Sequence, residues 1–173
     1  MENGSVDEDL LPLLQTLNSK EDYYTASSCS GRVVLLNLPR IGDKEHAQFI
    51  AKWHTCIDAG ALKHYLEQHY TGLVFLMLQS PILHVGARSV EHALRLRNIA
   101  VEAGFKYSSF KSMSKSKIIV ELLSTERLDM PVFINGSRTL CQDSVPVLVK
   151  LINSMLERAK KKLSILKDKT DIL

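Results

Sequence analysis

The segment with the most unusual composition is Ser27-Ser28-Cys29-Ser30-Gly31-Arg32, in which five small residues precede an arginine. Small side chains let a ligand approach backbone N–H groups, and hydroxyl and guanidinium groups hold carboxylate or phosphate oxygens. The segment is therefore a candidate anion-binding loop. A serine-rich segment before a strand is, however, more often an ordinary turn. Cys29 is a candidate nucleophile only if a base or a cation lies beside its thiol.

His84 is a second candidate, because its imidazole lies within an apolar segment predicted as a strand over Ile82 to Ala87. A polar ring in such a strand must find a hydrogen-bond partner or lie in a functional site. Of these two alternatives, a structural histidine with a hydrogen-bond partner is more common than a functional one. Arg88 has the same parity as His84 along the strand, so both side chains are expected on one face.

Aromatic and basic side chains form two further groups. Trp53 and His54 are adjacent in a segment predicted as an amphipathic helix, where a tryptophan is usually part of the core. The stretch from Ala103 to Val120 has no carboxylate and interleaves basic with aromatic residues, as suits single-stranded or loop RNA but also a solvated hairpin. These residues are Lys106, Lys111, Lys115 and Lys117, with Phe105, Tyr107 and Phe110 between them.

The composition is that of one ordinary globular domain over residues 1–173. The formal net charge is +3, too small to indicate a nucleic-acid binder by itself, and 24% of the residues are charged. Without a basic, apolar leader or an apolar run of roughly 20 residues, we expect a cytoplasmic protein with no membrane contact. Three cysteines without a Cys-x-x-Cys spacing indicate free thiols and no zinc site, and the six histidines show no ligand spacing that supports a metal-dependent hydrolase.

Hydrophobic periodicity predicts an α+β fold with a mixed β-sheet and flanking helices. Ser5 and Glu8 form a Ser-x-x-Glu capping box at the start of the first helix. Helices are expected over 6–18, 42–57, 62–69, 89–104 and 145–159, and strands over 33–38, 73–78, 82–87, 105–109, 117–123 and 130–134. The polar stretch 19–31 is expected to be a loop, and Asn135-Gly136 a turn.

The chain also resembles itself at an offset of 84 residues. Seven of the 34 aligned pairs between 5–38 and 89–122 are identical, and both segments run from a capped helix through a tyrosine and a serine-rich loop to an apolar strand. We therefore hypothesise an internal duplication, which would bring the two serine-rich loops to equivalent places.

The common catalytic motifs do not occur in the chain: it contains no Gly-x-Gly-x-x-Gly, P-loop, Gly-x-Ser-x-Gly or His-Glu-x-x-His. An ordered set of other motifs nevertheless resembles the wybutosine-synthesis tRNA methyltransferase family over nearly the whole chain. The set consists of Gly4-Ser5-Val6-Asp7-Glu8, Ser27 to Arg32, Pro81-Ile82-Leu83-His84-Val85, Arg88, Gly104-Phe105 and Arg127-Leu128-Asp129-Met130-Pro131.

The resemblance implies an S-adenosylmethionine-dependent N4-methyltransferase. Its substrate would be the tricyclic guanosine derivative 3′ of the anticodon of tRNA-Phe, with the anticodon stem-loop as partner and no DNA. The acceptor in archaeal members is 7-aminocarboxypropyl-demethylwyosine, and the short form of this chain favours an archaeal source. The family fold is a compact α+β domain that is not a Rossmann-type methyltransferase.

The sequence departs from the family pattern in three places. It begins at the Gly-Ser-Val-Asp-Glu motif without the lead-in helix that members often carry, so part of the tRNA contact surface is expected to be missing. Gly86-Ala87-Arg88 stands where a Cys-Arg pair is common, and Lys106-Tyr107-Ser108 replaces Arg-Asn-Ser, which keeps a charge but loses a bidentate fork. These changes point to altered cofactor affinity or to a related wyosine intermediate.

Within this family, methyl transfer requires donor and acceptor to be aligned while the acceptor nitrogen loses a proton. We hypothesise that Ser27 to Arg32 holds the amino-acid end of the cofactor or a tRNA phosphate, that His84 lies at the reacting centre, and that Arg88 orients substrate charge. Trp53 and Phe105 are candidates to stack on the tricyclic base or on adenine, with His54 and Lys106 beside them. The alternative is a non-catalytic RNA-binding module of the same fold.

Overall fold

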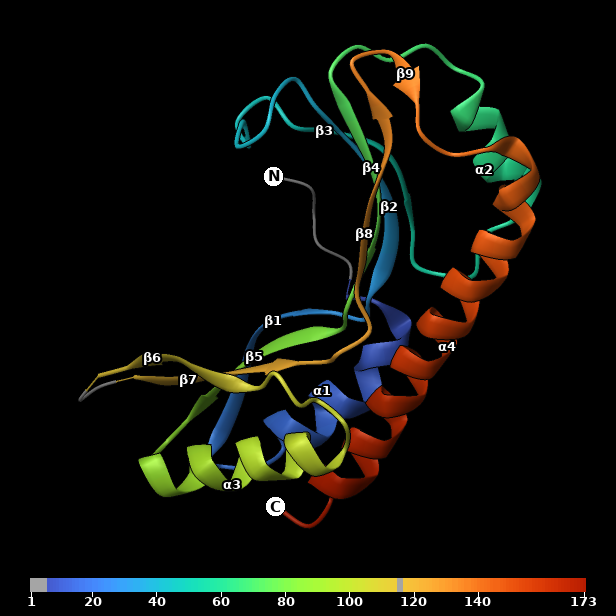
Figure 1. The fold of residues 1–173 in the computed structure, drawn as a ribbon. Helices are drawn as coiled ribbons and strands as arrows, with labels where there is room; N and C mark the ends of the chain where they lie inside the picture. The colour runs from blue at the N-terminus through green and yellow to red at the C-terminus, as the bar shows by residue number, and fades with distance from the viewer. Residues whose placement is uncertain (1–5, 115–116) are drawn as a thin grey trace. The chain divides into compact units, whose positions relative to one another are not determined.

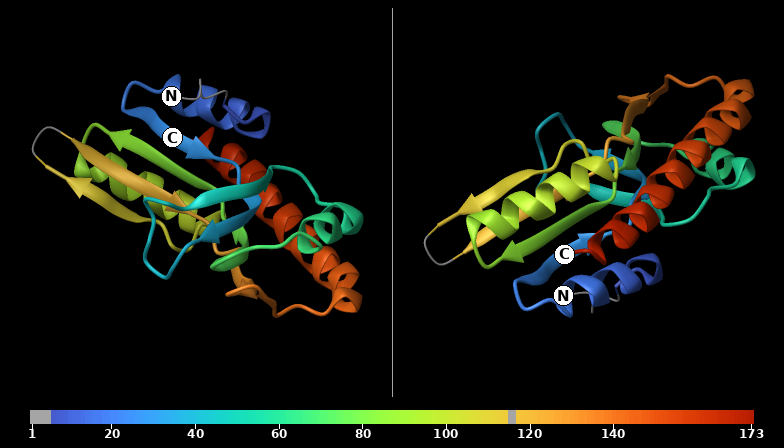
Figure 2. Two further views of the ribbon diagram at one scale, coloured as in Figure 1. Left: turned by 90° about the horizontal axis from the view of Figure 1, so that it is seen from above. Right: turned by 90° about the horizontal axis from the view of Figure 1, so that it is seen from below.

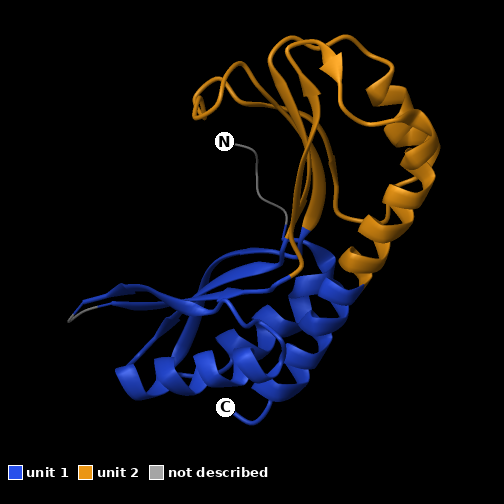
Figure 3. Ribbon diagram, in the orientation of Figure 1, with its two compact units in different colours: residues 1–31, 80–125, 158–173 blue, residues 32–79, 126–157 orange. Residues whose placement is uncertain are grey.

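A computed structural model describes residues 6–114 and 117–173, and its strands form two antiparallel sheets (Figure 1). Sheet A has the strand order β1-β5-β7-β6, and sheet B the order β3-β2-β4-β8-β9. The chain divides into two compact units, each with one sheet and its own hydrophobic core (Figure 3). Among the described helices, none combines the length and hydrophobicity that crossing a bilayer requires.

Unit 1 comprises residues 1–31, 80–125 and 158–173 and contains sheet A. Its strands are β1 (Tyr23–Cys29), β5 (Ile82–Ala87), β6 (Ser109–Met113) and β7 (Ile118–Leu123). Helices α1 (Leu11–Asn18) and α3 (Val90–Glu102) cover one face of this sheet, as Figure 2 also shows. The Ser89 hydroxyl accepts a hydrogen bond from the His92 N–H and so caps α3 at its predicted start.

Unit 2 comprises residues 32–79 and 126–157 and contains sheet B. Its strands are β2 (Arg32–Leu38), β3 (Gln48–Trp53), β4 (Leu73–Gln79), β8 (Leu128–Ile134) and β9 (Ser137–Arg138). Helix α2 (Ala59–Leu66) is capped by Asp58, and the long helix α4 (Val145–Thr170) begins in this unit and ends in unit 1. Asn135 and Gly136 both have positive φ, so the predicted Asn-Gly turn closes the β8–β9 hairpin.

Most of the elements predicted from periodicity are confirmed. Strands occur at 33–38, 73–78, 82–87, 117–123 and 130–134, and helices at 62–69 and 89–104, with differences of at most three residues at their ends. The helix predicted over 145–159 begins at Val145 but continues to Thr170. The first predicted helix begins with a 3-10 turn over Glu8–Leu10 before α1. Ser5 of the expected capping box and Lys115 of the basic stretch lie outside the described residues.

Three of the predicted elements were wrong. The helix predicted over 42–57 is wrong, because this segment contains strand β3. A β-bulge at Ile50 places Phe49 opposite Leu36 and Trp53 opposite Val33, on different faces of the strand. Residues 105–108 form a turn, and the strand expected at 105–109 begins only at Ser109. The serine-rich loop is largely strand β1, since hydroxyl side chains do not prevent strand pairing with β5.

The expected mixed sheet and the duplication also need correction. Every strand pair between described residues is antiparallel. Both aligned segments do contain one helix followed by two strands, but β6 and β7 pair as a hairpin, whereas β1 and β2 belong to different sheets. Similar local order therefore leads to different paths, and the strand pairing does not support a duplicated unit.

We predict that Gly72→Ala lowers the free energy of unfolding by about 1 kcal/mol or more beyond the effect of Gly42→Ala. Both glycines have φ near +85°, where an alanine costs about 1–2 kcal/mol. A Cβ on Gly72 would also lie 2.5 Å from the Leu38 carbonyl oxygen, whereas one on Gly42 meets no described atom within 4 Å. Equal effects in urea denaturation would contradict this explanation.

Candidate functional site on the open face of sheet A

Sheet A has one face packed on the core and one open face with polar side chains. Leu83 and Val85 of β5 and Val120 and Leu122 of β7 point into the core of unit 1. Because side chains alternate along a strand, His84 and Glu121 point to the opposite face. The register aligns Ser27 of β1, His84 of β5 and Glu121 of β7 in one row across the sheet.

The three side chains in this row are joined by short hydrogen bonds. Ser27 Oγ lies 2.8 Å from His84 Nδ1, and His84 Nε2 lies 2.8 Å from Glu121 Oε2. An ionised carboxylate only accepts hydrogen bonds, so we assign the proton of the neutral ring to Nε2. His84 Nδ1 then accepts from the Ser27 hydroxyl. This arrangement presents a polarised imidazole whose Nδ1 can take up a proton.

Glu121 is the charged end of the row. Its side chain is only 13% exposed, and Lys111 Nζ of β6 lies 3.1 Å from the same Oε2 atom. The hydrogen bond from His84 is the main cause of the lowered pKa of Glu121. Burial raises this pKa, and Lys111 lowers it further. The carboxylate therefore stays ionised at neutral pH and accepts the hydrogen bond from His84 Nε2.

A hollow of about 270 Å³ lies beside this row on the open face. Ile119 gives it an apolar wall, and Ser27 and His84 provide polar groups; its lining consists of Ala26, Ser27, His84, Lys111, Ser112, Lys117 and Ile119. Ala26 is the extra residue of a β-bulge in β1, so it faces this hollow without shifting Ser27 away from His84.

A second hollow, of about 410 Å³, lies at the end of the sheet where β1 begins and β5 ends, and Lys117 lines both. Its lining residues are Glu21, Asp22, Tyr23, Tyr24, Ala87, Arg88, Lys117 and Ile118. The Tyr24 ring covers Gly86 so closely that a Cβ there would lie 2.1 Å from it. Gly86 is thus the position that allows Tyr24 to lie flat between this hollow and the His84 row.

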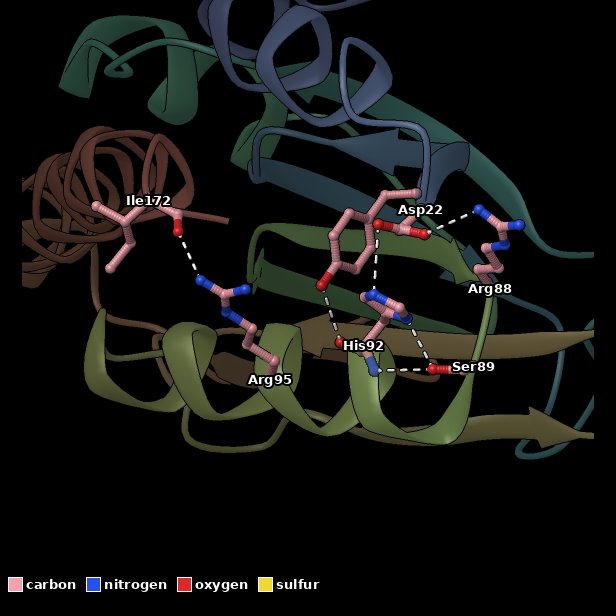
Figure 4. A network of polar contacts seen from close by, with 7 residues as sticks. Asp22, Arg88, Ser89, His92, Arg95 and Ile172 are labelled. Atoms are coloured by element: carbon pink, nitrogen blue, oxygen red, sulfur yellow. Dashed lines mark hydrogen bonds and ion pairs between the residues drawn. The ribbon is translucent and has the colours of Figure 1, made fainter.

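A polar network fixes Asp22 at the second hollow (Figure 4). Asp22 Oδ1 lies 3.5 Å from Arg88 Nη1, and Asp22 Oδ2 lies 3.3 Å from His92 Nε2. The Ser89 hydroxyl lies 2.7 Å from His92 Nδ1, and the Arg88 N–H donates to the Asp22 carbonyl oxygen. The carboxylate is therefore held in place from both sides.

The predicted Ser27 to Arg32 loop does not form one cradle. Ser27 and Cys29 lie on the open face of β1, whereas Ser28 opposes the core residue Leu83 and points to the other face. Ser30 is fully buried, its N–H donates to the Asp7 carboxylate, and Gly31 follows with φ +89°. Alternation along a strand thus separates side chains that a loop would have gathered.

Arg32, Trp53 and His54 belong to unit 2. Arg32 donates to Gln79 Oε1 at 2.7 Å and its guanidinium lies over the Phe49 ring. Trp53 packs edge-on against Tyr65, with 5.6 Å between ring centroids. Their binding roles, with that of His54, stay predictions.

Phe105 cannot stack on a bound base as predicted, because its side chain is fully buried in the core of unit 1. Lys106 beside it is exposed. Arg88 follows the end of β5, and its ion pair is with Asp22 rather than with a residue of the His84 row.

Sequence reasoning missed the pairing of Glu121 with His84 and the role of Asp22. Glu121 gave a usable signal, because it is the one charged residue in the otherwise apolar run Ile118–Leu123 and such a group needs a partner. Asp22 gave none, since an aspartate before a strand is common in turns.

The chain is similar to known methyltransferases over its whole length. It is 41% identical, over 100% of the chain and 88% of the relative, to a tRNA(Phe) 7-((3-amino-3-carboxypropyl)-4-demethylwyosine(37)-N(4))-methyltransferase 1 of Pyrococcus furiosus. Identity to the enzyme of the same name in Thermococcus kodakarensis is 39%, over 100% of the chain and 87% of that relative. The solved structure of the PH1069 protein from Pyrococcus horikoshii superposes with a TM-score of 0.89 at 42% identity, covering 95% of this chain and 85% of that one.

These similarities and the antiparallel fold define the class of the protein as a methyltransferase without the Rossmann architecture. More particularly, the family described as Methyltransferase TYW3 matches residues 1–171, and the chain belongs to this family. The resemblance found in the motifs is thereby confirmed.

We predict that His84→Ala raises the pKa of Glu121, because the main stabilisation of its charged form is lost. Lys111→Ala should raise the pKa less. In the native protein the lowered pKa stabilises the fold above the usual glutamate range, and this contribution is lost as the pH falls through the folded-state value. Carbon-13 NMR titration of the Glu121 carboxyl measures the change. An unchanged value in His84→Ala would contradict the assigned hydrogen bond.

Proposed function

We propose that the protein transfers a methyl group from S-adenosylmethionine to N4 of a wyosine-type tricyclic guanosine 3′ of the anticodon in tRNA-Phe. The observation that carries this proposal is the 41% identity, across the whole chain, to a relative named for that reaction. The anticodon stem-loop is the part of the tRNA that holds the base, so it is the proposed partner, and the cytoplasm is the proposed place of action.

The residues of the open face fit a nucleoside-containing methyl donor. Ligand pockets have volumes of roughly 300–1,000 Å³ and combine apolar walls with a few polar groups. The hollows of about 270 and 410 Å³ share Lys117 and offer Tyr24 as an aromatic surface, Ile119 as an apolar wall and Ser27 as a hydroxyl. S-adenosylmethionine would supply an electrophilic methyl group at this face.

His84 is the proposed acceptor of the proton that leaves the substrate nitrogen. When N4 bonds to the methyl carbon and the bond from that carbon to the donor sulfur breaks, S-adenosylhomocysteine would leave and the N4 proton would pass to His84 Nδ1. The Ser27 hydroxyl must turn aside for this transfer. The imidazolium that results is stabilised by the Glu121 carboxylate at Nε2. The hydrogen bond from His84 and, to a smaller extent, Lys111 favour the ionised form of that carboxylate. The sheet holds the row in place, so most of the remaining catalysis is positioning.

The test is calorimetric binding of S-adenosylmethionine, followed in the same preparation by methyl transfer to tRNA-Phe that carries the demethylated base. We expect binding with transfer. Binding of tRNA without binding of the donor would instead support the non-catalytic RNA-binding module.

We predict that His84→Ala lowers the methyl-transfer rate about 10²- to 10⁴-fold while the fold is kept, which is the usual contribution of a general base. Glu121→Gln should lower it less, because the ring and its Nδ1 remain. His64→Ala, which changes an exposed histidine on α2, is the matched control and should leave the rate unchanged. Full turnover by His84→Ala, with circular dichroism unchanged, would remove His84 from the mechanism.

A further inference from the structure

We propose that the hollow at the start of β1 and the end of β5 binds a zwitterionic 3-amino-3-carboxypropyl group. The residues that would hold it are Asp22, Arg88 and Lys117, with Glu21 and Tyr24 beside them. The inference rests on the proposed function and assigns a ligand chemistry to one part of the site.

The hollow is lined by equal numbers of acidic and basic side chains, a composition that does not suit a phosphate group. Two carboxylates, Glu21 and Asp22, line it together with two cations, Arg88 and Lys117. A phosphate group would meet both carboxylates at close range, and like charges at such distances disfavour binding. An α-amino acid group carries one ammonium and one carboxylate, so it can pair with both kinds of lining group.

Arg88 has the geometry to receive the carboxylate. Its guanidinium is 69% exposed, and its one ion pair among the described residues runs from Nη1 to Asp22 at 3.5 Å. Nη2 and Nε can therefore form the bidentate pair that arginine makes with a carboxylate. Lys117, which lines both hollows, adds a second positive charge.

Asp22 has the geometry to receive the ammonium. Its carboxylate is fixed between Arg88 and His92, and His92 is in turn oriented by Ser89 (Figure 4). A carboxylate offers about four lone-pair positions, so these two contacts leave room for a third donor. The network holds Asp22 in place, as a specific binding group requires.

The hollow also lies at a suitable distance from the reacting centre. Tyr24 and Gly86 form the pair of opposed residues between it and His84, and two residues along β5 span roughly 7 Å. An aminocarboxypropyl chain carries its charged groups on the third carbon from its point of attachment. A reacting atom beside His84 can thus be joined to charges beside Arg88.

Two molecules of the proposed reaction carry this same group. The tRNA base in the names of the relatives bears a 3-amino-3-carboxypropyl chain, and the sulfonium of S-adenosylmethionine bears an identical one. The chemistry recognised is the same in both cases, so the experiment has to separate the two sources.

The first arm measures binding of two anticodon stem-loops, one with the aminocarboxypropyl chain on its tricyclic base and one without it. If the substrate is the source, Arg88→Met weakens binding of the first at least tenfold and of the second less than twofold, as expected for a lost charged hydrogen bond. Asp22→Asn should show the same selectivity. Arg97→Met is the matched control, because Arg97 lies on α3 outside the hollow and loses the same charge.

The second arm measures binding of S-adenosylhomocysteine and of methylthioadenosine, which lacks the amino acid group. If the donor is the source, Arg88→Met weakens binding of the first at least tenfold and leaves the second unchanged. The inference is overturned if Arg88→Met weakens the binding of both ligands equally, or of neither, in each arm. Equal loss of affinity for both stem-loops, with a reduced salt dependence, would indicate that Arg88 contacts a phosphate.

These binding measurements need no methyl transfer. If Arg88→Met shows the predicted selectivity but the wild-type protein transfers no methyl group, the proposed reaction fails while the ligand chemistry stands. If it methylates the tRNA and Arg88→Met shows no selectivity in either arm, the reaction stands and the inference is wrong. Thermal denaturation of each variant checks that the fold is kept.

Discussion

The position of β5 between β1 and β7 constrains every other feature of the site, because side chains on a strand alternate between the two faces of a sheet. The register that buries Leu83 and Val85 is the one that presents His84 on the open face between Ser27 and Glu121. A slip of one residue would turn His84 into the core and leave its ring without these partners. Burial of the apolar face thus holds the polar row in place.

The electrostatics of the row follow from how few charges it contains. Glu121 is one carboxylate beside one imidazole and one ammonium, in a largely buried position where charges interact more strongly than in water. The hydrogen bond from His84 and, to a smaller extent, Lys111 favour the ionised form of Glu121, and Glu121 in turn polarises the imidazole of His84. The second hollow differs, because its two carboxylates and two cations cancel. Sheet A therefore carries His84, which can take up a proton, and beside it a hollow that is lined by equal numbers of acidic and basic side chains.

Local patterns in the sequence predicted local structure well and long-range contacts poorly. Alternation and continuous apolar runs located β4, β5 and β7, and a serine cap located the start of α3. Phe49 and Trp53 misled because their spacing of four suggested one helical stripe, whereas a β-bulge places them on opposite faces of β3. His84 was found because a ring in an apolar strand needs a partner, but which carboxylate supplies it depends on strand pairing across 37 residues. Such pairing is a property of the fold that no local window contains.

The order in which the chain is made bears on how unit 1 can form, because its core draws on three separate parts of the chain. Leu10 near one end packs in the same cluster as Leu163 and Leu166 of α4. During synthesis on the ribosome this core stays incomplete until the last turns of α4 have emerged, although α1 and α3 can pack on sheet A before then. Unit 1 can therefore be completed only after every residue of unit 2 has been translated.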